Sequence, residues 1–83
     1  MGIRVRFFST LAEKMGTREI FIEYKPGMTI RDIAEILSTR FPQLIELIEN
    51  GDILTSKNHV YASLDSKVND GDEIAFMPPV SGG

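Results

Sequence analysis

The residues of this sequence that could take part in chemistry stand at its end, in the run Pro78-Pro79-Val80-Ser81-Gly82-Gly83. Proline has no backbone N–H, so the two prolines end a strand and favour an extended conformation for the residues that follow. The two glycines have no Cβ, which lets the backbone pass close to another surface. The run could span about 20 Å at ~3.3–3.6 Å per residue. Chain ends are often glycine-rich and idle, but this pattern predicts a flexible tail, 78–83, that offers a carboxylate on Gly83.

That carboxylate would need help from other proteins to react. An α-carboxyl group has a pKa of ~3.3–3.7, so at neutral pH it is an anion and a poor electrophile. The chain has no cysteine, which excludes a disulfide framework, a thiolate cluster and a thiol nucleophile. Its one histidine, His59, argues against a histidine-based metal site. We therefore expect no metal, cofactor or catalytic side chain in this chain, and whether it counts as an enzyme stays open.

Composition narrows the class of protein further. The 83 residues suffice for one small domain, and 42% hydrophobic with 25% charged residues is typical of a globular fold. A net charge of -3 and the lack of a basic run argue against general nucleic-acid binding. We find neither an apolar run of membrane-spanning length nor a signal peptide. We expect a cytoplasmic protein that binds neither nucleic acid nor a membrane.

Alternating apolar and polar residues predict a hairpin of two strands, over 3–8 and 18–24. A capping box from Thr10 to Glu13 predicts a short helix between them. The expected cross-strand ion pairs place Arg4 and Arg6 opposite Glu19 and Glu23.

Helical spacing of apolar residues predicts a main helix that Thr29 caps and that ends near residue 40, followed by a short helix after Pro42. Two short strands, 53–57 and 59–64, and a last strand, 73–77, complete the chain. In the strand over 59–64 we expect Val60, Ala62 and Leu64 to face the core, with His59, Tyr61 and Ser63 facing out.

This order of elements predicts an α+β fold: a mixed sheet of four to five strands with one main helix packed on one face. The first and last strands would be central and parallel, which is the ubiquitin-like β-grasp arrangement. We expect residues 1–77 to form this domain and residues 78–83 to form its tail.

The face of the sheet away from the helix is the candidate partner surface. If Ile3, Val5 and Phe7 face the helix, Phe8 lies on this open face, and the same alternation exposes Tyr61 and Met77. Clustered apolar side chains usually mark a binding site, although each could be singly exposed without a role. Phe21 should lie on this face at the sheet edge. The predicted partner-binding residues are Phe8, Tyr61, Met77, Pro78, Pro79, Val80 and Ser81.

Three motifs carry a resemblance over the whole chain: Phe7-Phe8, Gly71-Asp72-Glu73 before Ile74-Ala75-Phe76, and the final run from Pro78 to Gly83. With them the sequence resembles the small subunit of molybdopterin synthase (MoaD), within the MoaD/ThiS family of ubiquitin-like sulfur carriers. One departure is Lys57-Asn58-His59, where relatives often carry an apolar residue, then asparagine and glycine.

The resemblance implies a chemistry for Gly83. An E1-like adenylating enzyme would use ATP to adenylate its carboxylate, and a sulfur-donating enzyme would provide the sulfur that turns it into a thiocarboxylate. The tail, including Gly82, would then enter the large subunit of molybdopterin synthase. There it would give sulfur to a pyranopterin precursor, in molybdenum or tungsten cofactor biosynthesis.

Two other functions remain open on the sequence. A Gly-Gly end also serves ubiquitin-like protein modifiers and sulfur carriers for tRNA or thiamin. A β-grasp interaction module without chemistry at its tail would need no reactive Gly83.

Overall fold

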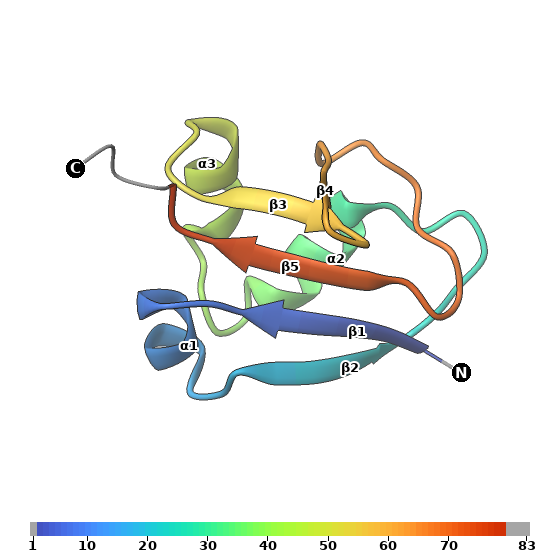
Figure 1. Ribbon diagram of the computed structural model, residues 1–83, viewed down its shortest axis with the longest axis horizontal. Coiled ribbons are helices and arrows are strands. Elements are labelled where there is room, and N and C mark those ends of the chain that lie inside the picture. Colours follow the sequence, from blue (N-terminus) through green and yellow to red (C-terminus); the bar gives the residue numbers. More distant parts are fainter. Residues whose placement is uncertain (1, 80–83) are drawn as a thin grey trace.

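The chain forms a five-stranded sheet with helices on one face (Figure 1), and this computed structural model describes residues 2–79. The elements in chain order are β1 (Gly2–Phe7), α1 (Thr10–Met15), β2 (Glu19–Glu23), α2 (Ile30–Leu37), α3 (Leu44–Glu49), β3 (Leu54–Lys57), β4 (Val60–Tyr61) and β5 (Glu73–Met77). Within the described residues, none of the helices has the length and apolarity needed to cross a membrane.

The first and last strands form the centre of the sheet, whose order is β2-β1-β5-β3-β4. β1 runs parallel to β5 and antiparallel to β2, while β3 runs antiparallel to both β5 and β4. The predicted mixed sheet with its parallel central pair is confirmed. Because β5 leads directly to Pro78, this pairing places the start of the tail at the middle of the sheet.

The core lies between the sheet and α2. Alternation in β1 buries Ile3, Val5 and Phe7, and β5 contributes Ile74 and Phe76. The rings of Phe7 and Phe76 stack across the parallel pair, with centroids 6.2 Å apart. From α2 the apolar stripe consists of Ile30, Ile33, Ala34 and Leu37. Burial of alternate residues on β1 and β5 leaves the other set facing away from the helix.

The capping of α2 by Thr29 is confirmed, and it gives a stability prediction. The Asp32 N–H donates to Thr29 Oγ1 at 3.3 Å, and the Thr29 N–H donates to Asp32 Oδ2 at 2.9 Å. Thr29→Ala leaves the first of these donors without its partner and should lower the free energy of unfolding by about 1 kcal/mol. Urea denaturation measures this change. Thr29→Ser keeps the hydroxyl and should lose much less, and equal losses for both variants would contradict the capping role.

The strand predicted over 59–64 is wrong in length and in the burial of Val60. β4 contains only two residues, and Val60 is 68% exposed. The chain leaves the sheet early because residues after β4 bind the start of α2. The Ile30 N–H donates to the Ser66 carbonyl at 3.0 Å, and the Arg31 N–H donates to the Leu64 carbonyl at 2.8 Å. These carbonyls satisfy the first donors of the helix, which a continued strand could not reach. Of the three residues predicted inward, Leu64 is buried and Ala62 is half-buried.

The expected pairing of both arginines with Glu19 and Glu23 is only partly right. Across the hairpin Arg6 faces Glu19, but Arg4 faces Phe21, and Glu23 faces Gly2. Arg4 instead reaches diagonally to Glu19. The register follows from burying Ile20 and Ile22 opposite Val5 and Ile3, because one buried face fixes the register of a strand pair.

Candidate functional site

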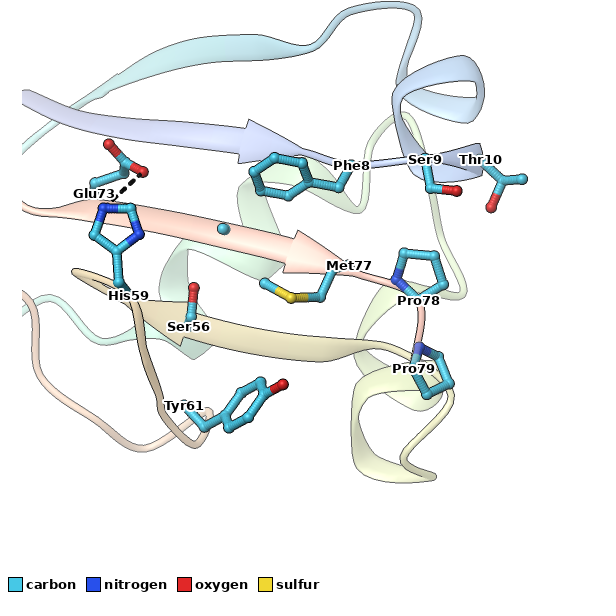
Figure 2. A pocket seen from close by; sticks show the side chains of 11 residues that line it. Phe8, Ser9, Thr10, Ser56, His59, Tyr61, Glu73, Met77, Pro78 and Pro79 are labelled. Carbon is cyan, nitrogen blue, oxygen red and sulfur yellow. Dashed lines mark ion pairs between the residues drawn. The ribbon is translucent and has the colours of Figure 1, made fainter. Parts of the chain in front are cut away.

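The open face of the sheet carries a groove of about 880 Å³ beside the start of the tail. Figure 2 shows around it side chains from β3, β4 and β5 and from the segment directly after β1. The described part of the predicted partner surface comes together here. The lining residues are Phe8, Ser9, Thr10, Ser56, His59, Tyr61, Glu73, Ala75, Met77, Pro78 and Pro79.

Strand alternation positions the apolar members of the groove. Phe8 follows β1, is 39% exposed, and stays attached to the sheet through its N–H, which donates to Phe76 O at 3.2 Å. Met77 ends β5 opposite Leu54 and is half-buried. Tyr61 projects from β4 and is 69% exposed. An aromatic side chain directly after β1, a second from β4 and a thioether from β5 therefore face one hollow.

Ala75 forms part of the floor. It faces Arg6 on one side and Ser56 on the other, and it is only 5% exposed. Ala75 lies on the face away from the helices, but its small side chain is covered by its neighbours. A small residue at this point deepens the groove between the larger side chains at its edges.

The tail begins at the end of this groove. Pro78 and Pro79 line it next to Met77 in Figure 2. Val80, Ser81, Gly82 and Gly83 lie outside the described residues, so their roles stay predictions. The described geometry places an apolar hollow directly before the predicted reactive end.

The other half of the open face is charged and centres on Glu73. Arg4 Nη1 lies 3.8 Å from Glu73 Oε1, while Arg6 Nη1 and His59 Nε2 lie 3.6 and 3.8 Å from Glu73 Oε2. A hydrogen bond from Arg4 to Glu19, together with the attraction between their charges, raises the pKa of Arg4. Such surface pairs contribute little to stability, about 0–1 kcal/mol. The same Arg6 guanidinium that pairs with Glu73 lies 5.1 Å from the centroid of the Phe8 ring, so the charged cluster adjoins the apolar groove.

The sequence argument missed Glu73 as the centre of this cluster. It did predict that the first and last strands are parallel neighbours, but not the register that sets Arg4 opposite Glu73. In a parallel pair, that register depends on burying Val5 beside Ile74 and Phe7 beside Phe76. The apolar alternation of β1 and that of β5 therefore already contained the information that sets this register.

The turn between β3 and β4 has a backbone that suits asparagine followed by glycine. Asn58 has a φ of 49° and His59 a φ of 71°. The Asn58 amide ties the turn to β5, because its Nδ2 donates to Asp72 Oδ1 at 3.0 Å and its Oδ1 accepts from the Glu73 N–H at 2.9 Å. His59 thus takes the left-handed position that glycine fills at lowest cost, and it holds its imidazole at the rim of the groove.

His59→Gly should raise the free energy of unfolding by about 0.5–1 kcal/mol, because glycine adopts this positive φ without steric cost. The contact with Glu73 that this change removes is made by an imidazole that is 80% exposed, and it adds little to stability. Urea denaturation of the variant beside the parent chain measures the change. His59→Ala removes the same imidazole but keeps the backbone cost, so it serves as the control. An Ala variant as stable as the Gly variant would contradict the role of the backbone.

Ser9 is a second residue with a positive φ at the groove. Its φ is 58° and ψ is -134°, and it precedes α1 without capping the helix through its side chain. The predicted capping box from Thr10 to Glu13 is therefore wrong, since Thr10 is already the first residue of α1. This sharp bend ends β1 directly after Phe8 and turns Ser9 and Thr10 towards the groove. No feature of the sequence marks Ser9 for such a backbone.

Phe21 lies on the same face at the edge strand β2, 71% exposed and outside the groove. The sequence prediction placed it at this edge. The open face thus carries an apolar groove beside the tail, an ionic centre around Glu73, and one separate aromatic side chain.

Comparison with known proteins identifies relatives along the whole chain. The family described as the ThiS family matches residues 5–83. The molybdopterin synthase sulfur carrier subunit of Escherichia coli (strain K12) is 31% identical over 83 residues, covering 98% of this chain and 99% of that protein.

Solved structures share the fold. The crystal structure of SAMP1 from Haloferax volcanii matches with a TM-score of 0.80 and 29% identity, covering 100% of both chains. The protein–protein complex of subunits 1 and 2 of molybdopterin-converting factor from Helicobacter pylori 26695 contains a chain that matches with a TM-score of 0.68 and 26% identity, again over 100% of both chains. The predicted β-grasp fold is confirmed.

Proposed function

The chain belongs to the ThiS family, and we propose from this membership that it is a ubiquitin-like sulfur carrier that acts as the small subunit of a molybdopterin synthase. The similarity to the E. coli sulfur carrier subunit supports this proposal, because it extends over 98% of this chain. The observation that carries it is the position of the apolar groove, which ends at Pro78 and Pro79. A partner bound in the groove would receive the tail at a fixed point.

The tail would carry the reactive carbon. In the proposed sequence, an E1-like partner joins the Gly83 carboxylate to the AMP part of ATP, and pyrophosphate leaves. Sulfide-level sulfur (HS⁻) from a sulfur-donating enzyme then attacks the acyl carbon, AMP leaves, and the carboxylate of Gly83 has become a thiocarboxylate. Gly82 keeps the tail narrow because glycine has no Cβ, and the side chain of Ser81 is small, so both would fit a narrow channel. The catalytic groups for both steps would belong to the partners.

The open face would bind the large synthase subunit. Phe8, Tyr61 and Met77 offer apolar and aromatic contact area, which is enriched in protein interfaces. The charged groups around Glu73 form a polar border on one side of that area. The relative from H. pylori is described in a complex of two subunits, which supports a partner of this kind. In this proposal the sulfur goes to a pyranopterin precursor held by the large subunit.

The first test is the intact mass of the protein purified under mild conditions from its native host. We expect a fraction shifted by one oxygen-to-sulfur exchange, mapped to Gly83 by fragmentation. The mapping is essential, because one oxygen added to a methionine changes the nominal mass by the same amount. A population of unmodified chains only, even with the activating enzyme and sulfur source present, would overturn the proposed carrier chemistry.

The likeness to small archaeal modifier protein 1 favours one further candidate, a protein modifier joined through Gly83 to a lysine. Both functions use an activated tail, so their products distinguish them. A modifier produces a ladder of larger conjugates that contain this chain, whereas a synthase subunit produces a sulfurated pterin and returns with an ordinary carboxylate.

A further inference from the structure

We propose that Met77 is an oxidation site, at which a peroxide converts the thioether to a sulfoxide and thereby weakens partner docking in the groove. The oxidation half of this inference depends only on the structure. The docking half rests on the proposed function, so the two halves need separate measurements.

The distribution of sulfur in the chain makes Met77 selective. The sequence has no cysteine and four methionines. Met15 and Met28 belong to the core and are 4% and 6% exposed. Met77 is half-buried and lines the open groove, while Met1 lies outside the described residues. An oxidant must contact the sulfur, and it reaches a core methionine only when the structure opens locally.

The backbone holds Met77 in the groove. Residue 77 pairs with Leu54 at the end of β5, and the next residue is a proline. Strand geometry therefore fixes the face on which the side chain lies. In Figure 2 the thioether lies between Phe8 and Tyr61, at the centre of the apolar side chains. A partner that covers these two rings must also cover the sulfur.

The oxidation changes what that partner would meet. The sulfur lone pair attacks one peroxide oxygen, the O–O bond breaks, an S–O bond forms, and hydrogen peroxide is reduced to water. Sulfur loses two electrons and the side chain becomes polar. Burial of a polar group without a hydrogen-bond partner is unfavourable, and Met sulfoxide disrupts apolar interfaces for this reason. Methionine sulfoxide reductases reverse the change.

The first measurement uses the full chain with an ordinary carboxylate at Gly83, so that no thiocarboxylate competes for the oxidant. Hydrogen peroxide is added, and peptide mapping follows each methionine with time. We expect Met77 to be oxidised at least about tenfold faster than Met15 and Met28, because the latter two need local opening. Equal rates for the three residues would overturn the oxidation half.

The second measurement titrates the large synthase subunit with the chain before and after peroxide. We expect the oxidised chain to bind about tenfold more weakly, because a central interface residue has become polar, and sulfoxide reductase to restore the affinity. The Met77→Leu variant cannot be oxidised at this position, so its affinity should be the same before and after peroxide. Met28→Leu is the matched control and should keep the sensitivity.

The outcomes separate the two halves. A chain with sulfoxide at Met77 that binds as tightly as the untreated chain would overturn the docking half alone. An untreated chain that does not bind the large subunit would overturn the proposed function and the docking half with it. Peptide mapping decides the oxidation half in either case.

Discussion

A chain that lacks Gly82 and Gly83 is expected to form no thiocarboxylate and to transfer no sulfur to a pyranopterin precursor. The truncation moves the terminal carboxylate back to Ser81, about 7 Å short of its former reach at ~3.3–3.6 Å per residue. A misplacement of even 1 Å can cost about 100-fold in rate, so the loss should be complete within detection. Reconstitution with the activating enzyme, ATP and a sulfur donor, followed by mass spectrometry, measures it.

The truncated chain should stay folded, since the described core ends at β5. Its urea denaturation curve is therefore the control, and it should overlay that of the parent chain. Ser81→Ala keeps the length of the tail and both glycines, so it should still accept sulfur. Undiminished function of the truncated chain would leave only the β-grasp interaction module among the functions considered.

Phe8→Glu is expected to weaken binding of the large subunit by about 30- to 1,000-fold, or ~2–4 kcal/mol, the range of a central interface residue. Phe8 directly follows β1 and lines the groove beside the start of the tail. A carboxylate there would have to be buried without a fixed partner, which is unfavourable. Isothermal titration with the purified large subunit measures the affinity.

Phe21→Glu is the matched control for this variant. Phe21 lies on the same face and is more exposed, 71% against 39% for Phe8, but it does not line the groove. It should change the affinity by less than about threefold, as peripheral residues do. Normal binding by Phe8→Glu would refute the groove as the docking surface. Equal weakening by both variants would instead extend the interface across the whole open face.

The central strands of the fold could be predicted because buried apolar residues recur at every second position along them. The alternation of Ile3, Val5 and Phe7 determined which face of β1 is buried, and the same pattern in Ile74 and Phe76 identified its parallel partner. The outward position of part of the groove lining followed from this, since a strand that buries one set of residues must present the other set. Periodicity alone therefore predicted that Phe8 and Met77 lie on the open face.

The parts that failed depend on contacts between distant segments. Val60 follows the apolar alternation of a strand, yet it lies at the sheet edge, where no helix covers it. The strand ends early because Leu64 O accepts a hydrogen bond from the first turn of α2, which local sequence does not reveal. The positive φ at Ser9 was equally hidden, because serine does not signal that backbone conformation.

The parallel pairing of β1 with β5 also has a consequence for how the protein is made. The two central strands come from opposite ends of the described chain, so the sheet closes only after nearly all of it has been synthesised, and such long-range pairings form slowly. A product that stops before β5 leaves β1 with an open edge, which favours aggregation and removal. It also lacks Ala75 and Met77, so it cannot present the groove. Synthesis that stops before β5 therefore yields no folded chain that could present the groove without the tail.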